Sequence, residues 1–275
     1  MNNYLKDKSD FVFRETLKIH KIAPGTRIAS SLSCVEILVA LYYGKLINFD
    51  PKNIYNEERD RIIISKGHGS ICLYPILADH GFFDIEELKS VGKEGSFLGT
   101  IPDPIIPGYE TVNGSLGHGL GVATGISMAI KEKKIDKNIV VLCGDGELYE
   151  GANWEAIMFA AHYSLDNITL IVDFNKTAML DFTKKIIDLE PLGDKFSAFN
   201  WDSYYIEKGH DVIEVYKSLK NIIPLRTKKP KLVVVNTIKG NKIEKLSNNP
   251  LAHIISLNSK EIDDILENLD IKENI

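Results

Sequence analysis

Two segments near the middle of the chain decide the fold: Asn138-Ile-Val-Val-Leu-Cys-Gly-Asp-Gly-Glu147 and Asn167-Ile-Thr-Leu-Ile-Val-Asp-Phe-Asn-Lys-Thr177. After its first asparagine, each segment has a run of mainly apolar residues, which predicts buried strands over 138–143 and 167–172. Between them, residues 152–163 carry apolar side chains at helical spacing and predict a helix. A strand, a helix and a second strand in this order predict a parallel pair joined by a right-handed crossover.

Oxygen-bearing side chains follow both predicted strands. Asp145 stands in a Gly-Asp-Gly sequence after the first strand, and Asn175 closes an Asp-Phe-Asn sequence after the second. Open parallel sheets bind ligands beyond the carboxyl ends of their strands, and carboxylate and amide oxygens suit Mg²⁺ or Ca²⁺. Gly144 and Gly146 would let the backbone approach an anion, which a following helix N-terminus also favours. Together the motifs predict a metal-bridged diphosphate site, although each alone also fits a plain turn or a loop cap.

The rest of the chain extends the alternating pattern. We expect an N-terminal helix broken at Pro24-Gly25, a helix over 33–43, a strand over 61–65, a helix over 70–80 and a Gly- and Pro-rich loop over 92–114. A helix of small residues over 118–131, a strand over 231–236 and an amphipathic C-terminal helix follow. This order predicts a three-layer, doubly wound α/β domain with a mainly parallel sheet over residues 1–240, and a C-terminal extension with a terminal helix over 241–275.

The run Gly117-x-Gly119-x-Gly121 imitates a dinucleotide-binding fingerprint. No predicted strand precedes it within a strand–helix–strand unit, so the match is weak. Close packing of the helix explains these glycines better.

Composition excludes several classes of protein. The chain has 275 residues, 44% of them hydrophobic and 26% charged, with a net charge of −5, and it lacks the basic footprint of a nucleic-acid-binding or membrane-surface protein. Cys34, Cys72 and Cys143 form no C-x-x-C pair, and their apolar flanks predict buried, reduced thiols. Because the N-terminus lacks a signal-peptide pattern and no apolar run reaches transmembrane length, we expect a cytoplasmic protein.

Longer stretches carry a specific resemblance. Residues 144–176, GDGELYEGANWEAIMFAAHYSLDNITLIVDFNK, are similar to the thiamine-diphosphate motif of the transketolase family. The insert EGANWEA, from Glu150 to Ala156, resembles transketolases more than the pyruvate-dehydrogenase-type enzymes that share the outer motif. The likeness continues through SSLSCVEILVALYYG, ISKGHGSICLYPILADHGFF, NGSLGHGLGVATGISMA and TIKGNKIEKLSNNPLAH, and so covers essentially the entire chain in order.

The resemblance implies a thiamine-diphosphate-binding fold with its cofactor site in this chain. By position it makes Asp145, the Asn175 side chain and the Thr177 carbonyl ligands of Mg²⁺ or Ca²⁺. Gly144 and Gly146 would lie against the diphosphate. Gly114 and Leu116 match backbone positions that meet the aminopyrimidine.

It also implies catalytic roles for three side chains. His68 resembles a family histidine beside the diphosphate and the reacting centre, and His253 one near both cofactor and substrate. Glu150 matches a carboxylate at the subunit interface near the activating glutamate. A surface position is the competing interpretation of both histidines, and for His253 the two are close. His162 and His210 are interpreted as structural or solvated.

Family enzymes are longer than this chain, and their second half holds the pyrimidine-binding domain whose glutamate activates the cofactor. The resemblance therefore implies a separately encoded partner subunit carrying that domain, and a heterotetramer is expected. An N-terminal fragment of a longer protein is the less favoured interpretation.

Three positions depart from the family pattern. Thr26-Arg27 stands where Gly-His is usual, Thr100-Ile101-Pro102 where Gly-His-Pro is usual, and His118 where glutamine is usual. They put ordinary pentose-phosphate substrates in doubt. We expect Arg27 to contact a carboxylate or phosphate of the substrate in a bidentate way, with Ile101 and His253 also at the substrate position. A plain surface charge is an equally supported interpretation of Arg27.

The function implied is that of a transketolase-like subunit transferring a two-carbon ketol unit between sugars, sugar phosphates or related aldehydes. Two alternatives remain open: a subunit of a decarboxylating synthase that acts on a 2-oxo acid, and a non-catalytic, cofactor-binding subunit.

Overall fold

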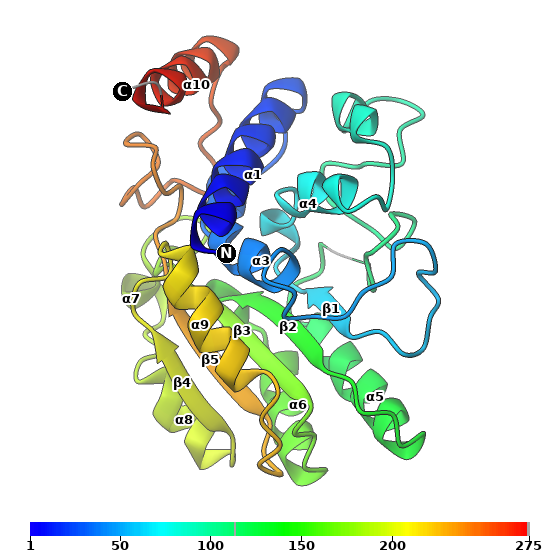
Figure 1. The fold of residues 1–275 in the computed structure, drawn as a ribbon. Helices are drawn as coiled ribbons and strands as arrows, with labels where there is room; N and C mark the ends of the chain where they lie inside the picture. The colour runs from blue at the N-terminus through cyan, green and yellow to red at the C-terminus, as the bar shows by residue number, and fades with distance from the viewer. Residues whose placement is uncertain (113, 274–275) are drawn as a thin grey trace.

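The structure is a computed structural model that describes residues 1–112 and 114–273. These residues contain a five-stranded sheet in the order β1-β2-β3-β5-β4, with neighbouring strands parallel. Its strands are β1 (Arg61–Ile64), β2 (Ile139–Gly144), β3 (Ile168–Phe174), β4 (Asp202–Ile206) and β5 (Lys231–Asn236). Helices cover both faces of the sheet (Figure 1). The predicted doubly wound α/β fold is confirmed.

The central strands are buried on both faces, as their continuous apolar runs predict. Along β2, Val140 and Leu142 belong to one hydrophobic core, whereas Val141 and Cys143 belong to the other. The same alternation holds in β5. Because successive side chains of a strand point to opposite faces, one short run supplies both cores.

One core lies between the sheet and a layer of helices formed by α1 (Asn2–Ile22), α2 (Ile28–Leu32), α3 (Val35–Tyr42), α4 (Leu73–Asp79) and α9 (Val212–Ile222). The other lies under α5 (Gly119–Glu132), α6 (Gly151–His162) and α8 (Leu192–Ala198). Three short 3-10 turns, η1 (Gly67–Gly69), η2 (Ile85–Ser90) and η3 (Gly146–Tyr149), and the single turn α7 (Thr183–Ile186) lie in connections. Helix α10 (Ser259–Glu273) ends the described chain and contacts α1 (Figure 1).

Among the longer elements, α8, β4 and α9 were not predicted. Strand β4 lies at the edge of the sheet and most of its side chains are only partly buried, so its sequence lacks a continuous apolar run. Helix α6 begins at Gly151, one residue before its predicted start. The 3-10 turn η3, which begins at Gly146 of the Gly-Asp-Gly motif, was not predicted.

The glycines of 117–121 have different surroundings. A Cβ atom on Gly119 would stand 2.5 Å from Ser65, and one on Gly117 would stand 2.5 Å from Glu150, so close packing explains both. At Gly121 a Cβ would meet nothing within 4 Å, and close packing within the described chain does not explain this glycine.

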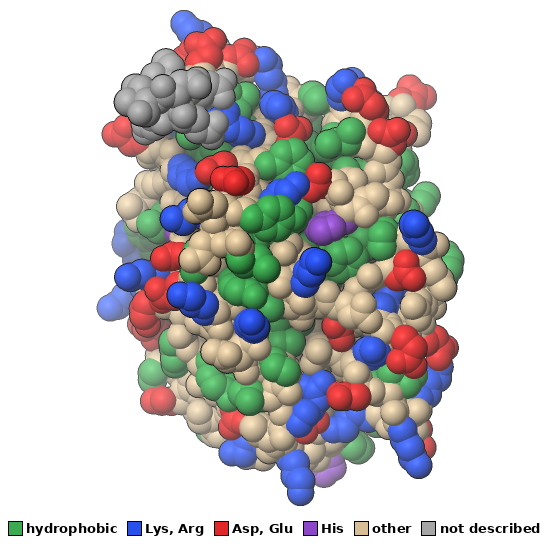
Figure 2. Space-filling model, viewed as in Figure 1, with side chains coloured by type: hydrophobic (Ala, Val, Ile, Leu, Met, Phe, Trp, Pro, Cys, Tyr) green, Lys and Arg blue, Asp and Glu red, His purple; other side chains and the backbone are tan. Residues whose placement is uncertain are grey.

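The surface and the thiols agree with the composition. Basic and acidic side chains are interspersed over the face that carries α1, α3 and α9 (Figure 2). Cys34, Cys72 and Cys143 are buried and unbridged, as predicted. Within the described residues, none of the helices combines the length and apolar character needed to cross a membrane.

Candidate cofactor and active site

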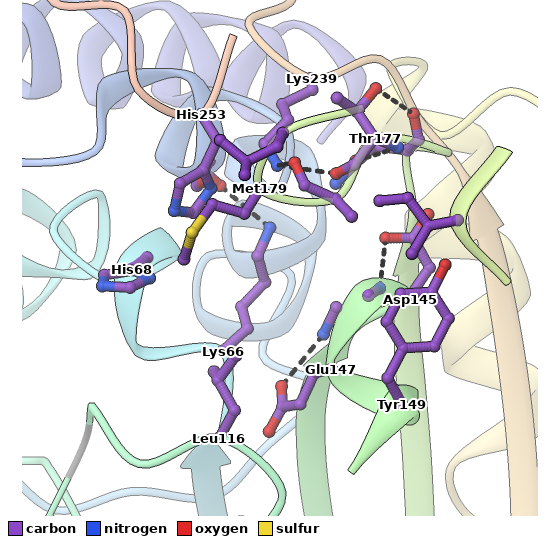
Figure 3. Close-up of a pocket in the computed structure, with 17 residues that line it drawn as sticks. Lys66, His68, Leu116, Asp145, Glu147, Tyr149, Thr177, Met179, Lys239 and His253 are labelled. Carbon is purple, nitrogen blue, oxygen red and sulfur yellow. Dashed lines mark hydrogen bonds between the residues drawn. The ribbon is translucent and has the colours of Figure 1, made fainter. Parts of the chain in front are cut away.

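The carboxyl ends of the inner strands meet at one edge of the sheet. Gly144 of β2 is in register with Asp173 of β3, and Phe174 of β3 with Asn236 of β5. A cavity of about 280 Å³ opens at this edge (Figure 3). Eight of the predicted site residues line it: His68, Leu116, Gly144, Asp145, Gly146, Asn175, Thr177 and His253.

Asp145 is held by the backbone of both strand ends. Its Oδ1 accepts a hydrogen bond from Gly146 N at 2.8 Å, and its Oδ2 accepts one from Lys176 N at 2.5 Å. Lys176 is in the left-handed region, with a φ of 61°. Burial raises the pKa of Asp145 to about 6, and the nearby charge of Asp173 adds to this effect. A bound cation would stabilise its charged form.

The Asn175 amide is oriented by a buried carboxylate. Its Nδ2 donates to Asp173 Oδ2 at 3.2 Å, and its Oδ1 accepts from Thr177 N at 3.1 Å. This arrangement turns the amide oxygen toward the Thr177 side of the cavity, where a metal would need an oxygen donor.

Asp173 itself is fully buried and joins four segments of the chain. Its carboxylate accepts hydrogen bonds from Lys66 Nζ, Ser33 Oγ, Asn175 Nδ2 and Thr237 Oγ1. Burial opposes its charged form, but the Lys66 ammonium and the hydrogen bonds outweigh burial and hold the pKa of Asp173 below its ordinary value. Asp173 therefore links the end of β3 to three distant segments, because the donors other than Asn175 come from elsewhere in the chain.

Glu147 ties the Gly-Asp-Gly turn to the segment before α5. Its carboxylate accepts from Gly117 N at 3.0 Å, from Gly144 N at 3.2 Å and from the Ser65 hydroxyl. Burial raises the pKa of Glu147. These contacts place Leu116 at the cavity wall.

The two predicted histidines lie together. The rings of His68 and His253 stand edge to face with centroids 5.0 Å apart, although the residues come from β1's end and from the C-terminal segment. His253 is 9% exposed, so it is buried in the cavity rather than on the surface. Its Nδ1 lies 3.2 Å from Ser30 Oγ, and its Nε2 has no hydrogen-bond partner among the described residues.

Both rings are neutral at physiological pH. Burial, with the positive charges of Lys239 and Arg27 nearby, lowers the pKa of His253 to about 3. Burial and Arg27 also lower the pKa of His68. The pair can therefore exchange hydrogen bonds with a ligand without adding charge.

Five residues at or near the predicted site do not line the cavity. Gly114 and Ile101 are exposed and adjacent, since a Cβ on Gly114 would stand 3.6 Å from Ile101 Cγ2. Glu150 and His118 are exposed beside Gly117, on the side of α5 and α6. Arg27 is exposed at the start of α2, close enough to lower the pKa values of both histidines by its charge.

Several lining residues were not among the predicted site residues: Ser30, Lys66, Glu147, Tyr149, Ala178, Met179, Leu180, Ile186 and Lys239. Lys66 and Glu147 adjoin predicted motifs, and Lys239 stands in the sequence Thr-Ile-Lys-Gly that follows β5. All three follow the carboxyl end of a strand, so including the polar residues after every predicted strand would have found them. The apolar residues after Thr177 give no comparable signal.

A doubly wound parallel sheet with oxygen-bearing side chains, two histidines and a cavity at its strand ends is typical of cofactor-binding α/β proteins. The chain matches the family model described as "Transketolase, thiamine diphosphate binding domain" over residues 18–274, and it belongs to this family.

Relatives and solved structures agree with that assignment. The chain is 38% identical to one subunit of an apulose-4-phosphate transketolase from Actinobacillus succinogenes, over 96% of this chain and 95% of the relative. It is 37% identical to one subunit of a 6-deoxy-6-sulfo-D-fructose transketolase from a Clostridium species, over 86% and 85%. The crystal structure of transketolase from Campylobacter jejuni superimposes with a TM-score of 0.85 at 29% identity. The match covers 92% of this chain but 40% of that one, so this chain spans less than half of the solved transketolase.

Proposed function

We propose that this chain is the thiamine-diphosphate-binding subunit of a two-subunit transketolase that moves a two-carbon ketol unit between sugars, sugar phosphates or related aldehydes. The observation that carries the proposal is the cavity at the strand ends, where Asp145, Asn175 and the His68–His253 pair converge from distant parts of the sequence. The names of the two relatives, each a transketolase subunit, support the same activity.

The cavity fits thiamine diphosphate held through Mg²⁺, with Ca²⁺ as an alternative ion. Asp145, the Asn175 amide oxygen and the Thr177 carbonyl are oxygen donors suited to either cation. Among the residues that the structure describes, the buried Nε2 of His253 has no hydrogen-bond partner, and a bound molecule would satisfy it. Thiamine diphosphate, when bound, supplies the nucleophilic carbon for breaking and making the carbon–carbon bond.

Three side chains receive catalytic roles in this proposal. His68 and His253, both neutral, form hydrogen bonds with oxygens of the substrate and orient them at the reacting centre. The exposed Glu150 faces outward, where it meets the partner and supports the glutamate that the partner supplies. When the cofactor is bound, Gly114 and Leu116 would contact its aminopyrimidine, and Gly144 and Gly146 would contact its diphosphate.

A separately encoded pyrimidine-domain subunit is the proposed partner, in a heterotetramer. The chain covers nearly the whole of a relative that is itself named as a transketolase subunit, but less than half of a solved transketolase, which supports a divided enzyme. The cavity is bordered by exposed apolar side chains, with Met179 52%, Leu180 60% and Ile186 45% exposed. A partner that covers this rim would bury it and exclude water from the site.

An anionic sugar is the proposed substrate. The relatives' names specify a sugar phosphate and a sulfo sugar, both of which carry an anionic group. Arg27 is exposed and its charge acts on both histidines, so it can contact such a group. Ile101, which is exposed beside Gly114, is also assigned to the substrate position. Replacing Arg27 by Ala should raise the KM for an anionic donor roughly tenfold, by loss of a charge-assisted hydrogen bond. The matched control is Lys21→Ala, an exposed cation paired with Asp263; an unchanged KM in Arg27→Ala contradicts the role.

Reconstitution tests the function. The purified chain is mixed with the candidate pyrimidine-domain subunit, thiamine diphosphate, Mg²⁺, a ketose phosphate donor and an aldehyde acceptor, and products are identified by mass spectrometry. We expect transfer only when both subunits are present, and loss of transfer but not of cofactor binding in His253→Ala. Release of CO₂ from a 2-oxo acid with no ketol transfer would instead indicate a decarboxylating synthase. Cofactor binding without turnover on any donor would indicate a non-catalytic subunit.

Two further assignments belong to the proposal. We place the protein in the cytoplasm, supported by its buried unbridged thiols and by the absence of a membrane-crossing helix from the described residues. We also divide the chain into a diphosphate-binding domain over 1–240 and an extension over 241–275, which limited proteolysis can test.

A further inference from the structure

His210 lies in the loop between β4 and α9, and its imidazole bridges two other parts of the chain. Its Nε2 accepts a hydrogen bond from Ile238 N at 2.8 Å, and its Nδ1 lies 3.0 Å from the Glu36 carboxylate. Because a backbone N–H can only donate, Nε2 carries no proton, and the proton of the neutral ring is on Nδ1. Glu36 is buried and accepts the hydrogen bond from Nδ1–H, which fixes the tautomer and the orientation of the ring.

The neighbouring Gly209 brings the same loop against the end of β5. Strands β4 and β5 are parallel neighbours, so the segments that follow them leave the sheet at the same edge. Gly209 N donates to the Asn236 carbonyl at 3.0 Å, and a Cβ at Gly209 would stand 2.4 Å from that oxygen, so only glycine permits this approach. Gly209 and His210 therefore hold the chain after β5 by two hydrogen bonds, one on each side of Thr237.

The segment after β5 contacts the proposed metal ligands through two side chains. Thr237 Oγ1 donates to the Asp173 carboxylate, which also accepts from the Asn175 amide at 3.2 Å. Lys239 Nζ donates to the Thr177 carbonyl at 2.7 Å, and the two residues lie side by side at one end of the cavity in Figure 3. The Asn175 amide oxygen and the Thr177 carbonyl are two of the three oxygen donors that the proposed function gives to the metal.

His210 can therefore act on the metal site without contacting it. Thr237 and Lys239 stand on either side of Ile238, so a shift of the Ile238 backbone moves both of their side chains. Gly240 N donates to the Ala29 carbonyl at 2.9 Å and anchors the far end of the segment. Among the described residues, His210 alone accepts a hydrogen bond from Ile238 N.

We infer that His210 is a positioning residue, whose imidazole, held by Glu36, fixes the Ile238 backbone and thereby the two side chains that support the metal ligands. The inference rests on the proposed function, because it takes Mg²⁺ and thiamine diphosphate as the ligands. It explains why a side chain with an acceptor and a donor on opposite sides of one ring stands here. It also gives a function to Glu36, which lies on α3 and does not line the cavity.

Two substitutions at His210 separate its two hydrogen bonds. A glutamine side chain extends as far as Nε2, so the amide oxygen in His210→Gln can accept from Ile238 N. An asparagine side chain extends only as far as Nδ1, so His210→Asn can donate to Glu36 but leaves Ile238 N without its acceptor. Calorimetry of the full-length chain, alone and with the candidate pyrimidine-domain subunit, measures the dissociation constant of thiamine diphosphate in excess Mg²⁺. We expect His210→Asn to raise this constant roughly fivefold or more, and His210→Gln to keep it within about twofold of wild type.

Asp211→Ala is the matched control, because Asp211 is the neighbour of His210 and its side chain serves another element. Its carboxylate caps α9 by accepting from Ile213 N at 3.0 Å and from Glu214 N at 3.2 Å. Loss of this cap should lower the melting temperature of the chain about as much as His210→Asn does, and leave the dissociation constant within about twofold of wild type. A merely structural role of His210 predicts instead that affinity falls with stability in both variants.

The tautomer of the His210 ring is an independent readout. In wild type at neutral to alkaline pH, nitrogen NMR should show a proton on Nδ1 and none on Nε2, and a proton on Nε2 would overturn the inference. Equal dissociation constants in His210→Asn and His210→Gln would overturn it too, as would a loss of affinity in Asp211→Ala as large as that in His210→Asn. In these cases the cofactor assignment stands, because wild type still binds. If wild type binds no thiamine diphosphate with or without the partner, the cofactor assignment fails, and this inference fails with it.

Discussion

Replacing Lys66 by Met should destabilise the fold strongly, because it leaves the Asp173 carboxylate charged and fully buried. Lys66 Nζ donates to that carboxylate, to Ser33 Oγ at 3.1 Å and to the Ser30 carbonyl at 3.0 Å. Removing one partner of a buried ion pair costs about 3–5 kcal/mol. Asp173 keeps three other hydrogen-bond donors, so we expect about 3 kcal/mol, the lower end of that range. Met retains most of the apolar stem and limits the packing loss.

Equilibrium unfolding in urea measures this cost as a change in midpoint at constant slope. The double variant Lys66→Met/Asp173→Asn removes both charges of the pair. Its loss of stability should be smaller than the sum of the two single losses by roughly 2 kcal/mol. Lys18→Met is the matched control: its ammonium pairs with Glu15 on an exposed helix surface, and its loss should cost under about 0.5 kcal/mol. A cost below about 1 kcal/mol for Lys66→Met, or additive single effects, would refute the buried-pair argument.

Three other predictions concern the fold and the proposed metal site. His20 is fully buried, and burial lowers its pKa from 6.5 to about 4. Between pH 6.5 and pH 4 the unfolded chain therefore binds a proton that the folded chain does not bind. Up to about 3 kcal/mol of the folding stability present above pH 6.5 should be lost as the pH falls toward 4. Urea unfolding of His20→Gln across that range checks it, since a pH slope equal to that of wild type would rule His20 out. Gly121→Ala places its new Cβ in open space, so it should stabilise the isolated chain by about 0.5–1 kcal/mol and raise its melting temperature. Gly119→Ala should lower the melting temperature, because its Cβ would overlap Ser65. Equal effects of the two substitutions would contradict the packing described. Asp145→Asn should weaken the Mg²⁺-dependent binding of thiamine diphosphate at least roughly tenfold, as expected for the loss of a charged metal ligand. Calorimetry measures this affinity, and an unchanged value would show that Asp145 is not a metal ligand.

Much of the candidate site was predictable because strands and their ends have local signals. The runs 138–143 and 167–172 are continuous, apolar and bounded by polar or turn residues, so their ends and the side chains that follow could be placed from sequence alone. The alignment of the two ends at one sheet edge then follows from parallel pairing. Strand β4 escaped prediction because an edge position needs no continuous apolar run.

Other features of the site depend on contacts between residues far apart in the chain. The sequence distance between Ser30 and His253 is 223 residues, and nothing near either one indicates that their side chains meet. The same holds for Lys239, whose ammonium reaches carbonyls 62 and 61 residues away. Its lack of a counter-ion among the described residues could be recognised only once the surrounding side chains were in place.

The sequence by itself indicated the family and the parallel α/β fold, and it proposed Asp145 and Asn175 as metal ligands, because periodicity and short motifs are properties of neighbouring residues. The tertiary structure decided that His253 is buried against His68, that Asp173 orients the Asn175 amide, and that Lys239 faces the cavity without a counter-ion from the described chain. Burial and charge compensation depend on the sum of all neighbours in space, and chain folding brings those neighbours from every part of the sequence.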